Sequence, residues 1–278
     1  QQKEENAMRM DASLPRGVTA DEAYISGEPI GLSLSKMLAV SFLLGLCIPG
    51  GILFVMERLR KKIVSVKEVK TLVKAPILAE VVGDNDRNAM ESLCANVRCM
   101  LGADDGKVVL VTSADGADGK DYVASNLAKN MAGTGIKTLL LELDFRNPGL
   151  SAEFSKTVGK GLVQYLTENL DLNSVISHSQ AGLDVIVAGA VPPNPSALLA
   201  SNKLKDFFAT VAKHYDCVVV DGSSVLNNPE LLYLSPLVSA TVCVCGIGAT
   251  EVDSLPRLSH MIEDGRLVNC GLVITDFQ

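Results

Sequence analysis

The chain has 278 residues, and its 25 basic and 32 acidic side chains give a net charge of −7 without an arginine-rich arm, so we expect no nucleic-acid partner. It has no tryptophan and only 4% aromatic residues, so its core is aliphatic, as is typical of α/β domains with buried parallel strands. Its seven cysteines form no CxxC pair and its three histidines are scattered, which excludes a zinc-site spacing.

The first predicted element is a membrane-spanning helix over residues 37–56. This stretch, MLAVSFLLGLCIPGGILFVM, has twenty residues without a charge, and at about 1.5 Å per residue it matches a hydrocarbon layer about 30 Å thick. The alternative is a buried helix of a soluble domain, but Pro49, Gly50 and Gly51 are better tolerated in a membrane helix. We therefore expect one membrane span.

Basic residues on one side of this segment predict its orientation. Arg58, Arg60, Lys61 and Lys62 follow it, whereas the twenty residues before it hold only Lys36. Because cytoplasmic flanks carry the excess of Lys and Arg, we expect the C-terminal part in the cytoplasm and residues 1–36 as an extracytoplasmic tail. Since the sequence does not start with methionine, we expect it to be the C-terminal part of a longer chain.

The remainder is predicted to be a juxtamembrane linker, 57–82, and a globular domain, 83–278. A first helix is expected over 88–101 from its apolar spacing. Six apolar runs then alternate with helical segments, at 107–112, 137–144, 183–189, 216–222, 240–246 and 270–275. This alternation predicts an α/β fold whose parallel sheet is covered by helices on both faces and binds ligands at the carboxyl ends of its strands.

A phosphate-binding loop is predicted where the first of these runs ends, in VTSADGADGKDYVASNLA (111–128). The backbone amides of such a loop bind phosphate, a lysine reaches the outer phosphates, and a Ser or Thr hydroxyl completes magnesium coordination. Gly119 and Lys120 are in place, but Asp121 stands where the hydroxyl belongs. The residues expected to contact a nucleotide are Ala117, Asp118, Gly119, Lys120, Asp121 and Tyr122.

Acidic residues end two of the predicted strands. The segment LLLELDFRNP contains Glu142, Asp144 and Arg146, and VVVDGSS contains Asp221. Carboxylates beside a phosphate loop can hold magnesium directly or through water, so Asp144 and Asp221 are the expected metal ligands and all four residues are expected at the catalytic centre. The alternatives are capping or solvated acids for the aspartates and a surface ion pair for Arg146.

These motifs together resemble the cytoplasmic domain of the bacterial tyrosine kinases, which in Gram-negative bacteria are fused to polysaccharide co-polymerases that set exopolysaccharide chain length. The similarity runs from about Ile30 to the end and includes TSADGADGK, LELDFRNP, GLVQYLTENLDLNSVI, AGAVPPNPSALLAS and YDCVVVDGSSV. It implies a P-loop fold in which Lys120 contacts the phosphates of Mg-ATP or ADP. It also implies that Asp144 and Asp221 bind magnesium, and that Glu142 replaces the aspartate proposed as general base for a tyrosine hydroxyl.

The resemblance further implies a location and partners. The chain would be a single-pass protein of the bacterial inner membrane that forms a homo-oligomer and acts with the machinery for polysaccharide polymerisation and export. In this family, the first cytoplasmic helix carries a Glu-x-x-Arg-x-x-Arg pattern that is used to assemble a ring. Helix 88–101 has only Glu91 and Arg98 of this pattern, which puts a ring contact through this helix in doubt. No tyrosine follows Tyr233, where the family's autokinases carry a phosphorylated cluster.

Other departures lie in the nucleotide motifs. Asp121 replaces a Ser or Thr, and Ala117 replaces a glycine of the loop. Thr275 replaces an asparagine near the nucleotide base, and the segment Gly222–Ser224 replaces prolines that follow the aspartate. A carboxylate about 4 Å from a phosphate charge costs roughly 4 kcal/mol at an effective dielectric near 20, or about a thousandfold in affinity. The alternative is that Asp121 binds magnesium itself.

We therefore predict a membrane-anchored, tyrosine-kinase-like pseudokinase that regulates polysaccharide chain length or export. One alternative is an active Mg-ATP-dependent tyrosine autokinase that tolerates Asp121. A second is a nucleotide-switch ATPase of the partitioning type, although the membrane span and the Asn194-Pro195 segment argue against it.

Overall fold

The computed structural model describes residues 34–59, 61–83, 86–102, 107–116, 118–154, 160–168, 170–180 and 182–277. The chain divides into two compact units, Gln1–Leu59 and Arg60–Gln278. The predicted tail, 1–36, lies almost entirely outside the described residues.

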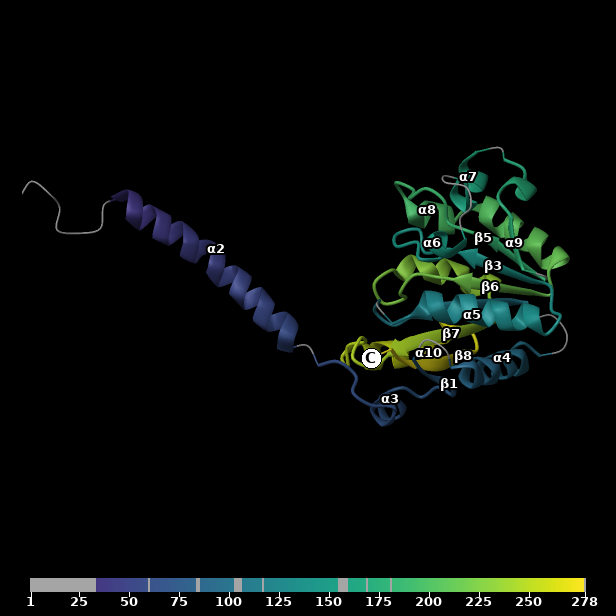
Figure 1. Cartoon of the computed structure of the whole chain (residues 1–278), viewed down its shortest axis with the longest axis horizontal. Coiled ribbons are helices and arrows are strands. Elements are labelled where there is room, and N and C mark those ends of the chain that lie inside the picture. The colour runs from purple at the N-terminus through teal and green to yellow at the C-terminus, as the bar shows by residue number, and fades with distance from the viewer. Residues whose placement is uncertain are drawn as a thin grey trace, which may run out of the picture. The chain divides into compact units, whose positions relative to one another are not determined.

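The first unit contains helix α2, Leu34–Leu59, which has 26 residues and includes all of the predicted span (Figure 1). In the described part of the chain, no helix meets the length and apolarity required to cross a bilayer. Side chains at 44, 46, 49–50 and 52–59 of α2 lie outside the described ones. The helix is thus confirmed, and its passage through a membrane stays a prediction.

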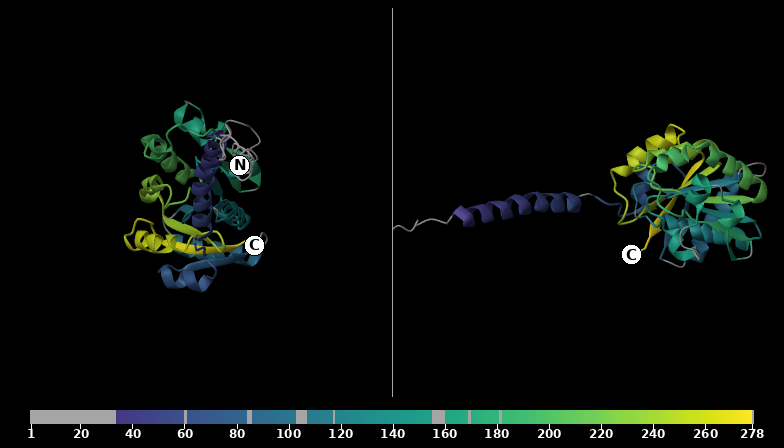
Figure 2. Two further views of the ribbon diagram at one scale, coloured as in Figure 1. Left: turned by 90° about the vertical axis from the view of Figure 1, so that its left-hand side faces the viewer. Right: turned by 90° about the horizontal axis from the view of Figure 1, so that it is seen from above.

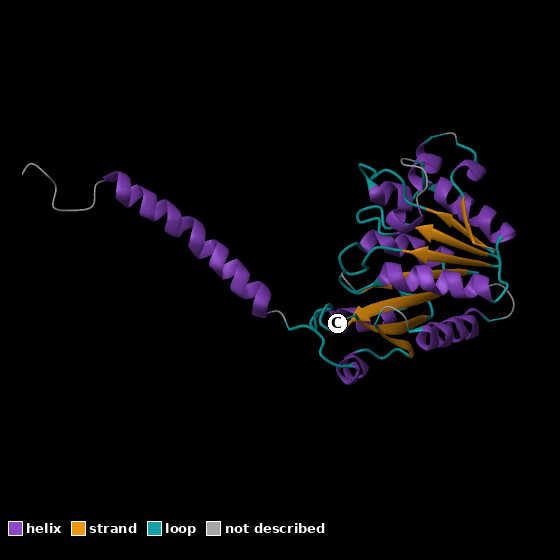
Figure 3. Cartoon of the chain, in the orientation of Figure 1, coloured by secondary structure: helices purple, strands orange, loops and turns teal. Residues whose placement is uncertain are grey.

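In the second unit, the described residues form one eight-stranded sheet with the order β1-β8-β7-β2-β6-β3-β5-β4 (Figures 1 and 3). The strands are β1 (Ile77–Val82), β2 (Val108–Ser113), β3 (Thr138–Glu142), β4 (Ser177–Gln180), β5 (Leu183–Ile186), β6 (Cys217–Asp221), β7 (Ala240–Gly246) and β8 (Cys270–Asp276). Each neighbouring pair is parallel except β4 and β5, which are antiparallel. The predicted parallel sheet is confirmed, with an antiparallel edge strand in addition.

Helices cover both faces of the sheet (Figure 2). Val109 and Val111 of β2 belong to one hydrophobic cluster and Val108 and Leu110 to the other, as the alternation of side chains along a strand requires. The first cluster includes α4 (Arg87–Leu101), α5 (Lys120–Gly133) and α6 (Leu150–Phe154). The second includes α3 (Val66–Leu72), α7 (Leu162–Thr167), α8 (Pro195–Leu199), α9 (Asn202–His214), the 3₁₀ helix η2 (Pro229–Leu237) and α10 (Ser254–Glu263).

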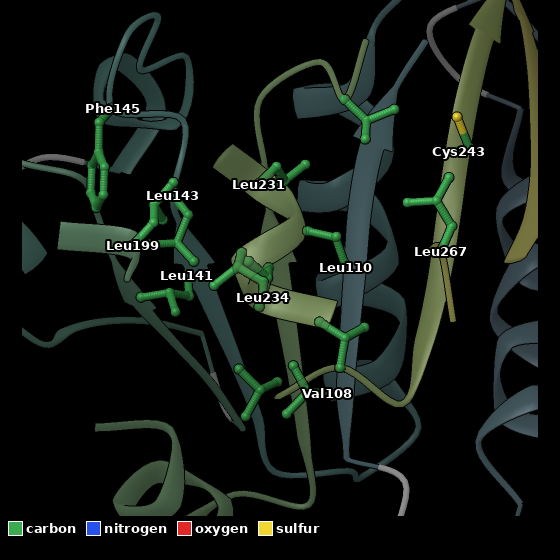
Figure 4. Packing of buried hydrophobic residues seen from close by; sticks show 14 of the residues in the cluster. Val108, Leu110, Leu141, Leu143, Phe145, Leu199, Leu231, Leu234, Cys243 and Leu267 are labelled. Carbon is green, nitrogen blue, oxygen red and sulfur yellow. The ribbon is translucent and has the colours of Figure 1, made fainter. Parts of the chain in front are cut away.

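The second cluster is the larger core of the domain. Figure 4 shows Leu231 and Leu234 of η2 beside Val108 and Leu110 of β2, with Leu141 of β3 next to them. A further short 3₁₀ helix, η1 (Leu172–Ser174), precedes β4.

The domain begins earlier than the sequence analysis predicts. Ile63 donates its N–H to the Thr250 carbonyl at 2.9 Å, and Val69 of α3 is fully buried. β1 pairs with β8 at the edge of the sheet. The predicted linker 57–82 is therefore wrong from about residue 61 onward, because its apolar side chains complete the core beside α10 and β8.

Candidate functional site

The loop between β2 and α5 leads directly into the first turn of α5. Gly119 precedes the helix with φ 75° and ψ 25°, a left-handed conformation that costs glycine nothing. A Cβ at this position would also lie 2.2 Å from Cε2 of Phe277. Since the first N–H groups of a helix lack helical partners, this geometry provides anion-binding donors at Lys120 and the residues beside it. Ala117 lies outside the described residues.

Lys120 is buried among carboxylates. Its Nζ lies 3.0 Å from Asp144 Oδ2 and 3.4 Å from Asp221 Oδ1, and it also donates to Asp121 Oδ1. Burial by itself would lower the pKa of Lys120, but the charges of Asp221, Asp121 and Asp144 together outweigh it and raise that pKa above its ordinary value. Lys120 is therefore a cation that is already paired.

Asp221 carries the least compensated charge of this group. The residue is fully buried, and its Oδ2 has no hydrogen-bond partner within the described residues. Burial raises the pKa of Asp221 well above its ordinary value; Lys120 opposes this effect, while Asp121, Glu142 and Asp144 add to it. The carboxylates outnumber the ammonium group, so a cation bound here would stabilise the ionised site.

Asp144 and Arg146 lie in the turn after β3. Asp144 Oδ1 accepts the N–H groups of Arg146, at 3.3 Å, and Asn147, at 3.1 Å. The Arg146 guanidinium turns away to Glu230 of η2, with Nη2 2.7 Å from Oε1. Although burial raises the pKa of Glu230, the hydrogen bond from Arg146 lowers it below its ordinary value. Arg146 thus forms the ion pair considered as the alternative, and its catalytic role stays a prediction.

Glu142, the predicted base, ends β3 and is paired in register with Asp221 at the end of β6. Its side chain is fully buried. Its Oε1 accepts the Leu150 N–H at 2.7 Å and its Oε2 accepts the Ala188 N–H at 2.8 Å. The structure thus brings Glu142 beside Asp221 but engages both of its oxygens with main-chain donors.

Asp121 lies where the sequence places it, next to the lysine. Its side chain is 38% exposed and packs against the turn after β3, where a Cβ on Gly149 would lie 1.9 Å from Asp121 Oδ2. A cavity of about 320 Å³ opens beside it, lined by Gly116, Asp118, Gly119, Lys120, Asp121, Asp144, Asn147, Ser224 and Asn228. Asn147, Ser224 and Asn228 were not among the predicted site residues, although Asn147 and Ser224 lie within the quoted motifs.

Asp118 connects the loop to the ends of β7 and β8. Its Oδ1 accepts from Thr250 Oγ1 at 2.8 Å, its carbonyl accepts from Thr275 Oγ1 at 2.8 Å, and burial raises the pKa of its carboxyl to about 6. A second cavity, of about 230 Å³, is lined there by Asp118, Gly246, Ile247, Gly248, Ala249, Thr275 and Phe277. No motif pointed to Thr250, because it reaches the loop only through the fold.

Tyr122 does not face the first cavity. Its ring packs edge-on against Phe277, with centroids 5.2 Å apart. Tyr122 instead lines a groove between α4 and α5 together with Asn126 and Arg98. The contact of Tyr122 with a nucleotide stays a prediction.

Known proteins similar in sequence are tyrosine kinases. No protein-family model matches the chain. It is 29% identical over 184 residues to the tyrosine-protein kinase CpsD of Streptococcus pneumoniae, a match that covers 66% of this chain and 80% of CpsD. It is 30% identical over 210 residues to the tyrosine-protein kinase Etk of Escherichia coli K12, which covers 73% of this chain but only 29% of Etk.

The chain belongs to the bacterial tyrosine kinase family. The kinase domain of Escherichia coli Etk superimposes with a TM-score of 0.68 at 23% identity, covering 76% of this chain and 93% of that domain. The BceF tyrosine kinase domain gives a TM-score of 0.67 at 20% identity, covering 78% of this chain and all (100%) of that domain. These structures share the P-loop α/β fold with this member of the family.

Proposed function

We propose that this member of the tyrosine kinase family is a kinase-like component of exopolysaccharide assembly whose site binds Mg-ATP weakly. The observation that carries the proposal is the contact of Asp121 with Lys120 in the first turn of the helix that follows the phosphate loop. Because the chain spans less than a third of Etk, the role in polysaccharide chain length or export rests on the family alone.

The residues at the strand ends suit a magnesium ion. Asp144 and Asp221 would hold it, since oxygen ligands are those that magnesium prefers. Asp221 Oδ2 has no partner in the described part of the protein, and the neighbouring carboxylates leave an excess of negative charge. When bound, the ion would neutralise charge on the outer phosphates of ATP.

The two cavities suggest how a nucleotide would lie. The phosphates would occupy the cavity beside Gly119 and Lys120, and the base would lie toward Thr275 and Phe277. Lys120 is shared among carboxylates, so a phosphate must compete with Asp121 for it. The repulsion of roughly 4 kcal/mol per unit pair at close range is reduced by the partial exposure of Asp121 but stays unfavourable.

Calorimetry of Mg-ADP binding to the full chain tests this proposal. We expect weak or undetectable binding by the parent and a gain of about tenfold or more in Asp121→Thr, which restores the hydroxyl and removes the charge. Asp171→Thr is the matched control, because Asp171 is an exposed aspartate whose side chain makes no capping hydrogen bond. Micromolar binding by the parent that is lost in Asp121→Thr would refute the proposal and assign Asp121 to the metal.

The second candidate is an active tyrosine autokinase. It is favoured by the contacts of Asp121, Asp144 and Asp221 with the same lysine, which place Asp121 near the two predicted metal ligands. Among the described residues, no three acidic, cysteine or histidine side chains are grouped so that they could bind one metal ion. It predicts phosphotyrosine on the purified protein after incubation with Mg-ATP and none in Lys120→Met. The partitioning-type ATPase instead predicts ATP turnover without phosphotyrosine.

We also propose attachment to the bacterial inner membrane through 37–56, with the second unit in the cytoplasm as part of a homo-oligomer. The uncharged stretch 37–56 within α2 and the cations that follow this stretch support this placement. Recovery of the full chain in the membrane fraction after alkaline washing would agree with it. Recovery in the wash would contradict it.

A further inference from the structure

We propose that Glu142 is a positioning residue that fixes the turn carrying Asp144, and is not a general base. The inference concerns the same site as the proposed function and draws its relevance from it. It stands, however, on hydrogen bonds that involve no nucleotide.

Glu142 accepts hydrogen bonds on both oxygens. Its Oε1 accepts from the N–H groups of Leu150, at 2.7 Å, and Ser151, at 3.3 Å. Its Oε2 accepts from Ser151 Oγ at 2.8 Å and from the Ala188 N–H at 2.8 Å. A carboxylate has about four lone-pair positions, so these four hydrogen bonds fill its capacity to accept.

A general base needs a free lone pair. It must come within about 2.6–3.2 Å of the proton that it removes, directly or through one water. The Glu142 side chain is fully buried, and its donors are main-chain groups and one hydroxyl of the protein itself. To act as a base, Glu142 would have to break bonds that hold two segments of the fold together.

Those bonds fix the residues that face Lys120. Leu150 and Ser151 begin α6, so Glu142 closes the turn 143–149 at its far end. Within that turn, Asp144 Oδ1 accepts two main-chain N–H groups and Asp144 Oδ2 lies 3.0 Å from Lys120 Nζ. Glu142 thus acts on the site through Asp144.

The bond to Ala188 adds a second anchor. Ala188 follows β5, which pairs with β3 in parallel, and its carbonyl accepts the Val163 N–H at 3.0 Å. Glu142 therefore joins the chain after β5 to the turn after β3. Aspartate would be shorter by one methylene, about 1.5 Å, and from the same backbone could not span Leu150 and Ala188 together.

Amide hydrogen exchange of the full chain without nucleotide tests the inference. In Glu142→Gln, either orientation of the amide turns an NH₂ toward a main-chain N–H, so bonds are lost although the shape is kept. We expect exchange to rise about tenfold at Leu150 and Ala188, and also at Arg146 and Asn147, whose N–H groups bond to Asp144. Exchange in β7 and β8 should not change.

Two further variants test whether the length of Glu142 and its separate bonds fix the turn. Glu142→Asp keeps the carboxylate but shortens the side chain, so we expect the same rise in exchange at Leu150 and Ala188. Ser151→Ala removes one bond and should give a smaller rise at the same amides. Glu230→Gln is the control, because it removes the charge that pairs with the Arg146 side chain and leaves the turn's own bonds intact.

Unchanged exchange at Arg146 and Asn147 in Glu142→Gln would overturn the inference, and so would parent-like exchange in Glu142→Asp. Should Glu142→Gln fail to fold, Ser151→Ala decides, and no rise there has the same meaning. Since no nucleotide is present, a failure of the proposed weak binding would leave this result untouched.

Discussion

At the residue scale, the site is governed by buried charge. Lys120, Asp144 and Asp221 come from α5, the turn after β3 and the end of β6, and they meet because parallel strands end at one edge of the sheet. The sequence predicted these residues from their positions at strand ends. It could not predict the pairing of Arg146 with Glu230, which are 84 residues apart.

Asp118 makes the stability of the domain dependent on pH. Burial raises the pKa of its carboxyl from 3.8 to about 6, so between these values the native state holds a proton that the unfolded chain has lost. The contribution of Asp118 is full below about pH 4 and is lost as the pH rises through about 6. We expect the free energy of unfolding of the parent to fall by about 2 kcal/mol relative to Asp118→Asn between pH 4 and 7, measured by urea unfolding.

The hydroxyl of Thr250 gives a control for this effect. Its hydrogen bond to Asp118 Oδ1 lowers the pKa that burial raises. Thr250→Val should therefore move the loss of stability to higher pH. Parallel pH profiles of the parent and Asp118→Asn would contradict the assignment.

At the element scale, the apolar patterns of the central strands predicted them well, and the edges were missed. β4 reads Ser-His-Ser-Gln and has no apolar run, because an edge strand is buried least. β1 alternates buried and exposed positions only in part, and it lies within 57–82, which was predicted to be a linker. In both cases pairing with a neighbouring strand supplied what local sequence lacks.

The start of α7 depends on a close approach of two main chains. A Cβ on Gly161 would lie 2.4 Å from the Val187 carbonyl oxygen and 2.5 Å from the Gly189 nitrogen, atoms that cannot swing aside. Gly161→Ala would also weaken the bond from the Leu162 N–H to the Val187 carbonyl, now 2.9 Å. We expect it to lower the free energy of unfolding by about 2–3 kcal/mol in denaturant titrations.

Gly133 at the end of α5 is the matched control. Nothing lies within 4 Å of a Cβ built there, and the residue is helical. Gly133→Ala should leave stability unchanged or raise it by about 0.5 kcal/mol, since alanine is the better helix residue. Equal effects of the two substitutions would show that crowding at α7 is not the cause.

At the scale of the whole molecule, the chain divides into two compact units between residues 59 and 60. The second unit includes α3 and β1, and Ile63, Val69 and Val81 are almost completely buried in it. The sequence predicted a juxtamembrane linker over 57–82 and therefore a domain that begins at Gly83. Burial places the boundary more than twenty residues earlier.

Truncation tests this boundary. A chain that begins at Arg60 should unfold in one transition with the stability of the second unit in the full chain. A chain that begins at Gly83 loses α3, β1 and several buried side chains worth about 1.5–3 kcal/mol each, so we expect a loss of at least about 5 kcal/mol. Circular dichroism in urea measures the stability of both chains. Equal unfolding midpoints for the two chains would show that 57–82 is a linker, as the sequence predicted.

The sequence by itself determined the parallel α/β sheet, the phosphate loop and the acids at the strand ends, because apolar runs and glycine-rich turns are signals that a few neighbouring residues carry. Only the tertiary structure decided which groups the acids contact. Glu142 meets Ala188 across 46 residues, and Asp118 meets Thr250 across 132. Hydrogen bonds over such separations form when the sheet brings the ends of its strands together, and no local pattern encodes them.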